Sequence, residues 1–357
     1  QDKPARNDVM AETKAKFLKN AWYAAIWAHE LPAATPIAKT FLNEPVVLFR
    51  TRDGTPVALE DKCCHRAAPL SVGECEDDGI RCGYHGLKFD ATGACIEVPG
   101  QAQIPPGAKV RAYPVVERWN MVWIWLGDPA QVDESTIPDY FWLDDAGWTS
   151  ATGYIPMQGN YQLLVDNLLD FTHVTYLHKN TLSADPEEAK VPVKVERDDR
   201  SVAVSRWILG HDAPPLFAKA GGFDGKVDRW QTTTWLAPST LAFDVGCAKA
   251  DTGAVDGDRT QGISIWSTHM ITPETDTSTH YHWAYVRDFA LEDDKMTDIL
   301  HDGAKATFEE DVVIIEAQQQ RLGGIGFDGL IDINADNPPL QMRRIMDDLI
   351  AAENAAS

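Results

Sequence analysis

The sequence predicts an α+β protein with an all-β N-terminal domain, followed by a domain in which helices pack on an antiparallel sheet. In the first third of the chain, short apolar runs alternate with turn residues, a pattern typical of antiparallel strands. Beyond a connector at 130–145 that carries several charges and a proline, strand-like segments stand between helical ones. The length of 357 residues and the hydrophobic content of 44% also favour two moderate cores. We therefore expect domains at 15–135 and 136–357.

Three hairpins are expected in the first domain. The first joins 45–49 to 57–59 through a turn that contains Gly54. The second surrounds 90–93 in "LKFDATGACIEVP", and the third surrounds 118–120 in "YPVVERWNMVWIWLGDP". The alternating Trp123 and Trp125 are expected to pack in the core.

The second domain is expected to begin with a helix in 160–178, where leucines recur at helical spacing. Two further helices are expected at 297–322 and 338–353, the last with proline at its start. The predicted strands between the helices are 191–195, 202–208, 230–236, 241–245, 262–272 and 280–287.

Charge and composition exclude several classes of partner. A net charge of −22 would repel nucleic acid and anionic membranes. No stretch approaches eighteen consecutive apolar residues, so no transmembrane helix is expected, and the N-terminus shows no signal-peptide pattern. The six cysteines show no disulfide framework, which predicts a reduced, cytoplasmic protein.

Two pairs of metal-binding residues lie close together in the first domain. Cys63-x-His65 is followed, after sixteen residues, by Cys82-x-x-His85. Two thiolates and two imidazoles can hold a [2Fe-2S] cluster, with the thiolates on one iron and the histidines on the other. A structural zinc ion accepts the same donors. The mixed composition of each pair favours the cluster, because zinc fingers usually pair like with like.

A second group of possible ligands lies in Asn167-x-x-Asp170-x-x-His173-x₄-His178. Two histidines and a carboxylate on one face of an iron leave positions open for oxygen and substrate. Asp170 and His173, three residues apart, would share a helix face. His173 and His178 would lie about 140° apart on a regular helix, so a π-type turn or a helix end is needed between them. The alternative is that these are ordinary helix residues.

Several segments resemble the oxygenase component of Rieske non-haem iron oxygenases, most closely the vanillate and dicamba O-demethylase branch. The resemblance covers about residues 15–350 and includes the two motifs above. The other matching segments are "KNAWY", "PVVER…VWIWLGDP", "VDRWQ", "ITPETDTS" and "EEDVVIIEAQQ". It implies a Rieske domain followed by a helix-grip catalytic domain.

The resemblance implies that Cys63, His65, Cys82 and His85 bind the cluster, and that Asp311 joins His173 and His178 on a mononuclear Fe(II). The register is open, because Glu309 and Glu310 precede Asp311 and can also bind iron.

The resemblance also implies a head-to-tail homotrimer in which the cluster of one subunit lies beside the iron of the next. Asp170 would then connect His85 and His173 across the interface, and a carboxylate there would orient both imidazoles. Asp170 and Asn167 are the catalytic candidates.

The implied reaction uses O₂ and electrons from NADH, delivered by a separate reductase, a ferredoxin or both. The chain has no glycine-rich dinucleotide motif of its own. Oxygen would enter a C–H bond of a methyl or alkyl group on a small aromatic substrate, and O- or N-dealkylation would release formaldehyde. The alternatives are methyl hydroxylation or ring dihydroxylation of an aromatic acid or sulfonate. A non-enzymatic alternative is a Rieske electron carrier.

The pocket is less well defined by the sequence. An aromatic acid needs a cationic or hydrogen-bonding anchor in an apolar pocket. His269, in a predicted strand, matches a pocket position of the dicamba-type relatives and is the candidate substrate residue. Ala242 and Asp302 are expected at two further pocket positions, where the aspartate would repel a carboxylate.

Overall fold

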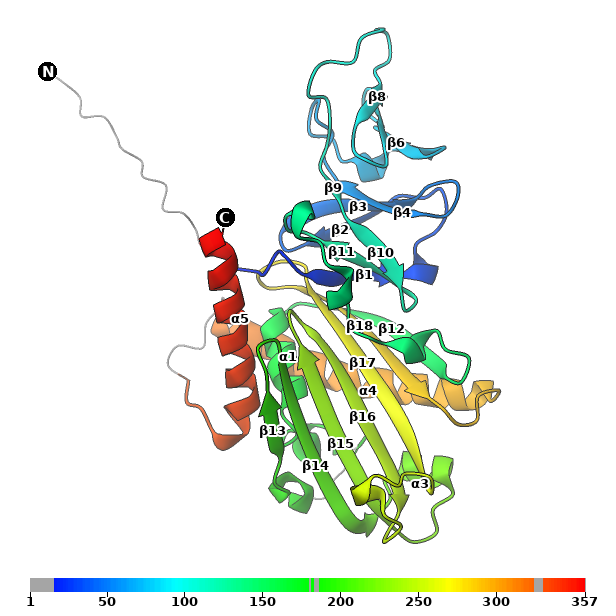
Figure 1. The fold of residues 1–357 in the computed structure, drawn as a ribbon, viewed down its shortest axis with the longest axis vertical. Helices are drawn as coiled ribbons and strands as arrows, with labels where there is room; N and C mark the ends of the chain where they lie inside the picture. The colour runs from blue at the N-terminus through cyan, green and yellow to red at the C-terminus, as the bar shows by residue number, and fades with distance from the viewer. Residues whose placement is uncertain (1–15, 180, 183–185, 324–329, 357) are drawn as a thin grey trace, which may run out of the picture.

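The computed structural model describes residues 16–179, 181–182, 186–323 and 330–356. It has the α+β architecture that the sequence predicts, with small sheets first and then a large antiparallel sheet with helices (Figure 1). The two parts share buried side chains. A tryptophan-rich cluster joins Trp22 and Trp123 to Met270 and Val286 of the large sheet. The boundary at 135/136 stays a prediction.

The first domain consists of three small antiparallel sheets, ordered β1-β11-β10, β2-β3-β4-β9 and β5-β6-β7-β8. The predicted hairpins are confirmed as β3–β4, β7–β8 and β10–β11, and Trp123 and Trp125 are buried as expected. The strands are β1 (Trp22–Trp27), β2 (Ile37–Phe41), β3 (Glu44–Arg50), β4 (Pro56–Glu60), β5 (Glu74–Glu76), β6 (Gly79–Arg81), β7 (Lys88–Asp90), β8 (Cys95–Glu97), β9 (Ala112–Tyr113), β10 (Val115–Arg118) and β11 (Met121–Trp125).

The second domain is built on a seven-stranded antiparallel sheet, ordered β12-β18-β17-β16-β15-β14-β13. The six predicted strands are present, five of them longer than expected and the first shifted from 191–195 to 194–197, as β13 (Lys194–Arg197), β14 (Ser201–Asp212), β15 (Lys226–Leu236), β16 (Thr240–Lys249), β17 (Gly262–Pro273) and β18 (Thr279–Arg287). The edge strand β12 (Thr149–Met157) was not predicted. Its sequence is rich in small and polar residues, and Gly153 leaves room for the Trp283 indole, with which a Cβ would collide.

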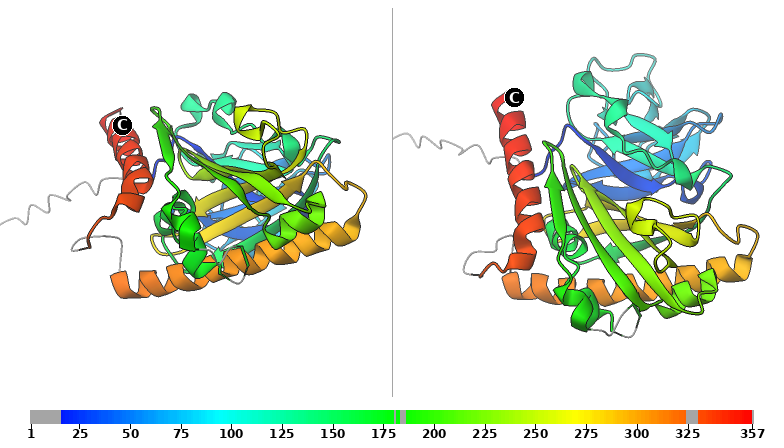
Figure 2. Two further views of the ribbon diagram at one scale, coloured as in Figure 1. Left: turned by 90° about the horizontal axis from the view of Figure 1, so that it is seen from below. Right: turned by 60° about the horizontal axis from the view of Figure 1, so that its bottom comes forward.

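The helices are α1 (Tyr161–Leu169), α2 (Val174–Leu177), α3 (Pro215–Gly221), α4 (Asp294–Leu322) and α5 (Asn337–Ala356). The long α4 crosses one face of the sheet, and α5 lies beside β13 and β14 (Figure 2). In the part of the chain that the structure describes, no helix is long and apolar enough to cross a membrane. The cytoplasmic location stays a prediction.

The helix expected within 160–178 is interrupted. It ends at Leu169, and Asp170 has an extended backbone, with φ −103° and ψ 121°. The Asp170 carboxylate accepts hydrogen bonds from the Thr172 backbone N–H, at 2.7 Å, and from its hydroxyl. This local bonding competes with helix continuation, so α2 begins as a separate turn.

Candidate metal centres

The two cluster loops have the same backbone geometry. In the first loop, Cys63 N–H donates to Ala68 O at 2.8 Å, and Ala67 N–H donates to Cys63 O at 2.9 Å. In the second loop, Cys82 N–H donates to Leu87 O at 2.8 Å, and its carbonyl accepts from the residue four further on. That residue is Gly86, which corresponds to Ala67 of the first loop. Both have a positive φ, of 75° for Gly86 and 56° for Ala67. Both loops therefore turn through the left-handed region at the same position.

The four predicted cluster residues come together at the tips of these loops. Cys63 and Cys82 are buried, whereas His65 and His85 are exposed, with ring centroids 4.5 Å apart. Burial raises the pKa of the Cys63 thiol to about 11, and the neighbouring Cys82 adds to this rise, while the His65 backbone N–H acts against it. Two adjacent buried thiols need a metal to hold them as thiolates. Thiols on one side and imidazoles on the other match the donor set of a [2Fe-2S] cluster.

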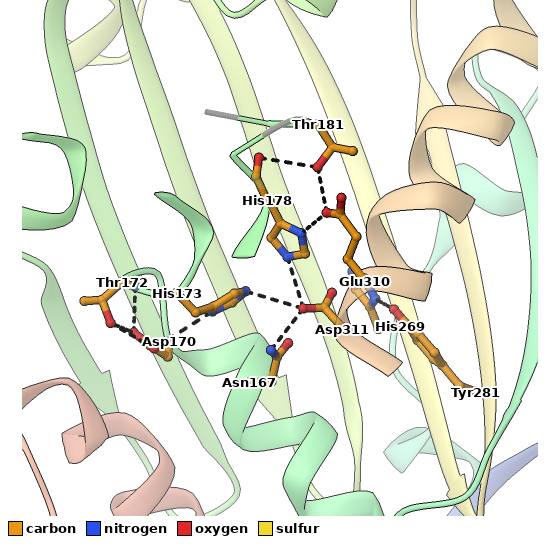
Figure 3. Close-up of polar contacts among 10 residues, drawn as sticks. All are labelled: Asn167, Asp170, Thr172, His173, His178, Thr181, His269, Tyr281, Glu310 and Asp311. Carbon is orange, nitrogen blue, oxygen red and sulfur yellow. Dashed lines mark hydrogen bonds and ion pairs between the residues drawn. The ribbon is translucent and has the colours of Figure 1, made fainter. Parts of the chain in front are cut away.

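The second group of ligands lies where α1, α2 and α4 meet (Figure 3). His173 is the N-cap of α2 and His178 its C-cap, so a helix end provides the change of direction that two histidines five residues apart require. Their ring centroids are 5.1 Å apart. Asp170 and His173 do not share a helix face as expected, because both lie outside α1 and α2.

The third member of this group is Asp311 of α4. Its Oδ1 lies 3.0 Å from His178 Nε2 and 3.6 Å from His173 Nε2. Ligand atoms of the three residues all lie within 4.8 Å of one another. Asn167 Nδ2 donates to the same carboxylate oxygen at 3.0 Å. Two imidazoles and one carboxylate, partly open to a cavity, fit an Fe(II) that keeps coordination positions free.

The three consecutive acids of α4 occupy different environments. Glu309 is exposed and pairs with Lys305. Glu310 Oε2 lies 2.7 Å from His178 Nδ1 and accepts a hydrogen bond from Thr181. Asp311 faces both histidines, so Glu310 contacts only the far side of one imidazole.

The environments of the two histidines differ. Burial lowers the pKa of His173, even though Asp311 and Asp170 oppose the shift. Burial acts in the same direction on His178, but its hydrogen bonds to Asp311 and Glu310 prevail and raise its pKa. His173 Nδ1 has no hydrogen-bond partner among the described residues, and Asp170 Oδ2 lies 3.9 Å from it.

A cavity of about 310 Å³ opens from this group between the sheet and α4. This volume suits a single substituted aromatic ring. Its apolar wall includes Leu168, Phe171, Phe243, Val245, Leu300 and Phe308, and its polar residues include Arg229, Gln231, Ser267 and His269.

The comparisons with known proteins agree with this geometry. Residues 21–114 match the Rieske [2Fe-2S] domain, and residues 157–352 match the vanillate O-demethylase oxygenase C-terminal domain. This chain is a Rieske oxygenase of the vanillate O-demethylase family.

Relatives of the oxygenase match over nearly their whole length. A putative toluene-4-sulfonate monooxygenase system iron-sulfur subunit from Comamonas testosteroni is 46% identical, over 95% of this chain and 99% of its own. A vanillate O-demethylase oxygenase subunit from a Pseudomonas species is 35% identical, over 96% and 97% respectively. The crystal structure of dicamba monooxygenase bound to dicamba has a TM-score of 0.87 at 34% identity, covering 95% of this chain and 99% of that one.

The oxygenase therefore carries a [2Fe-2S] cluster and a catalytic Fe(II), and it is an aromatic monooxygenase component. The zinc site and the isolated electron carrier are thereby excluded. Relatives of this kind are components of systems in which other proteins transfer electrons, and this oxygenase likewise depends on separate electron-transfer partners.

Two pocket predictions for the oxygenase are wrong. The Asp302 side chain is 83% exposed and lies 3.1 Å from His301 Nδ1, so it does not enter the cavity. Ala242 packs with the tryptophan-rich cluster on the face of β16 opposite Phe243. The expected repulsion between Asp302 and a carboxylate therefore does not arise.

His269 does line the oxygenase cavity, but its polar atoms are occupied. Nδ1 lies 2.6 Å from the Tyr281 hydroxyl, and Nε2 lies 2.9 Å from Ser267 Oγ. Burial lowers the pKa of His269 to about 3, so the ring is neutral at physiological pH. His269 therefore offers no charge to an anion.

Sequence reasoning missed two polar residues of the oxygenase site. Glu310 was considered only as a rival ligand, and its contact with His178 follows from the rotation of α4. Arg229 lies within "VDRWQ", a segment that was used only to place the branch. The available signal was that Arg229 and Gln231 are two residues apart, because side chains at that spacing in a strand lie on one face.

Proposed function

We propose that this chain is the terminal oxygenase of a dealkylating system, and that it hydroxylates a methyl or alkyl group bound to oxygen or nitrogen on a small aromatic substrate. The hydroxylated product then breaks down to the free hydroxyl or amine and an aldehyde, which is formaldehyde when the group is methyl. The observation that carries the proposal is the His173, His178 and Asp311 group at the mouth of a mostly apolar cavity sized for one aromatic ring. The family match over both domains supports it.

In this proposal Cys63, His65, Cys82 and His85 hold the cluster, and the group on α2 and α4 holds the Fe(II). When bound, the iron supplies oxygen activation, with electrons that arrive through the cluster. The apolar wall of the cavity excludes water and orients the ring of the substrate. Asn167, through its hydrogen bond to Asp311 Oδ1, fixes the orientation of the carboxylate.

Electron transfer is proposed to cross a subunit interface in a head-to-tail homotrimer. Within one chain, the small sheet that contains β6 and β8 lies at the end of the molecule away from α1 (Figure 1), and the second cluster loop joins β6 to β7 in this sheet. Asp170 is partly exposed beside His173, as a residue that faces a neighbouring subunit should be. The exposed His85 of the next subunit would meet it there. A ferredoxin, an NADH-dependent reductase or both would reduce the cluster.

The proposed reaction is tested by supplying the protein with a compatible reductase, NADH and a panel of methoxybenzoates, N-alkylated anilides and methylarene sulfonates. We expect oxygen consumption, one formaldehyde per substrate consumed and a demethylated or dealkylated product by mass. A cis-dihydrodiol, or a benzylic alcohol that keeps its carbon, would contradict dealkylation and leave the oxygenase assignment intact.

A second candidate is hydroxylation of an aryl methyl group on an arene sulfonate. It is favoured by two toluene-4-sulfonate monooxygenase iron-sulfur subunits of Comamonas testosteroni, one of them putative, which are 46% and 44% identical to this chain. The same panel separates the two candidates, because aryl methyl hydroxylation yields a stable alcohol and no formaldehyde.

Glu310→Gln is expected to weaken Fe(II) binding about 10- to 100-fold, because the carboxylate that orients His178 and increases its basicity is lost. The amide preserves volume, so the fold should survive. Iron affinity is measured by titration of the apo mononuclear site, with cluster absorption as an internal reference. Glu309→Gln is the matched control, since Glu309 pairs with Lys305 in solvent. Equal iron affinity in both variants would remove Glu310 from the support of His178.

A further inference from the structure

We propose that Arg229, assisted by Gln231, binds the anionic group of the substrate, so that this oxygenase acts on an arene sulfonate or carboxylate. This rests on the proposed function for the ring and its reacting group. Beyond that function, the proposal specifies that the substrate is an anion and that Arg229 is the residue that selects it.

The sheet presents Arg229 to the cavity. On β15, alternate residues from Val227 to Trp235 share one face, and Arg229 and Gln231 belong to that set. The neighbouring strands continue the same rows, because Gln231 pairs with Val245 on β16 and Phe243 pairs with Ser267 on β17. The cavity wall therefore has two polar columns, on β15 and β17, with an apolar column between them.

The charge of Arg229 is incompletely compensated. Arg229 is only 5% exposed, so its guanidinium group is almost completely removed from water. Its Nη1 lies 3.3 Å and 3.5 Å from the two carboxylate oxygens of Glu188, which are long contacts for a charged pair. Its Nε has no hydrogen-bond partner among the described residues. A buried donor without a partner is costly, and an anion in the cavity would satisfy it.

A second guanidinium adds to the positive potential at this end of the cavity. Arg206 donates through Nε to Gln231 Oε1 at 2.6 Å and through Nη1 to the Glu188 backbone carbonyl at 2.7 Å. Its Nη2 also lacks a partner in the described part of the chain. Because Arg206 occupies the oxygen of Gln231, the amide N–H₂ of that residue is left to donate toward a ligand.

Among the nearby acids, only Glu188 pairs with Arg229. The Glu188 carboxylate contacts Arg229, whereas Arg206 hydrogen-bonds the Glu188 backbone carbonyl, so this one carboxylate stands beside two guanidinium groups. Asp170 also lines the cavity and acts on Arg206 at longer range, but its oxygens accept from Thr172. Asp311 faces the iron ligands. Among the polar residues of the β17 column, His269 is neutral, so the cation that an anionic substrate needs is on β15.

The test uses the holoenzyme and measures binding by calorimetry in the absence of reductant. The ligands are 4-methoxybenzenesulfonate, 4-methoxybenzoate and the neutral isostere 4-methoxyphenyl methyl sulfone. We expect Arg229→Gln to weaken binding of at least one of the two anions about 10- to 150-fold, as loss of a charged hydrogen bond implies, and to change sulfone binding less than twofold. The anion that loses more identifies sulfonate or carboxylate as the natural group.

Two further variants protect the test from misfolding and nonspecific charge effects. Arg229→Gln leaves Glu188 buried without its cation, so the double variant Arg229→Gln/Glu188→Gln removes both charges and is expected to show the same loss. Arg197→Gln changes an exposed arginine of β13 and should bind all ligands as the native protein does. Cluster absorption and circular dichroism report folding in each variant.

The proposal is overturned if the native protein binds the sulfone as tightly as both anions, or if the double variant retains full anion affinity. Formaldehyde assays separate this result from the proposed function. Arg229-dependent anion binding without formaldehyde would contradict dealkylation alone. Equal demethylation of neutral and anionic methoxyarenes would contradict the anion site alone.

Discussion

Asp311→Ala is expected to abolish turnover and empty the mononuclear iron site while leaving the cluster spectrum unchanged. The Asp311 carboxylate oxygen lies 3.0 Å and 3.6 Å from the two Nε2 atoms of His178 and His173, so it is placed to complete their donor set. Without it, two neutral imidazoles remain, which bind Fe(II) weakly. The loss of activity should exceed the roughly 100-fold typical of removing a supporting partner outside the coordination sphere. Iron analysis, cluster absorption and oxygen uptake measure the three effects separately.

The adjacent acids provide controls of graded effect. Glu309→Ala should retain iron and turnover, because Glu309 is exposed on the opposite side of α4. Glu310→Ala should lower iron affinity without eliminating the site. If Asp311→Ala kept its iron while Glu310→Ala lost it, the assignment of the carboxylate ligand would be shifted by one residue.

Asp170→Asn is expected to keep both metal centres and to lose nearly all turnover, at least about 100-fold. The amide is almost isosteric, so the turn between α1 and α2 should form. It carries no charge, however, and it presents a donor where the proposed bridge between two imidazoles requires an acceptor. Stopped-flow measurement of cluster reoxidation, with substrate and O₂ present, should show slowed electron transfer to the iron.

Thr172→Val is the matched control for this variant. It removes the hydroxyl that donates to the Asp170 carboxylate and keeps the carboxylate itself. We expect most of the turnover to remain, because the backbone N–H of residue 172 still holds the carboxylate at 2.7 Å. Native rates of cluster reoxidation in Asp170→Asn would remove Asp170 from the electron path.

The sequence alone predicted the class of fold, the two Cys and His pairs of the first site and the two histidines of the second. Short-range patterns were sufficient for the hairpins, since the turn at Gly54 and the strands beside it are adjacent in the chain. The cluster ligands could also be predicted from local sequence, because each Cys and His pair lies within four residues. The five-residue spacing of His173 and His178 also predicted a π-type turn or a helix end, and each histidine lies at one end of α2.

Tertiary structure decided which other side chains line the cavity beside the predicted iron ligands and His269. Arg229 and His269 are forty residues apart, and they line one cavity because β15, β16 and β17 pair in a particular register. The rotation of α4 likewise separated Asp311 from Glu310 and turned Asp302 toward solvent. Local sequence specifies which backbone conformations are favourable, but strand register and helix rotation are set by the packing of the whole apolar core. Ligand spacing is a property of short segments and can be predicted from them, whereas the pocket is a property of distant segments in contact.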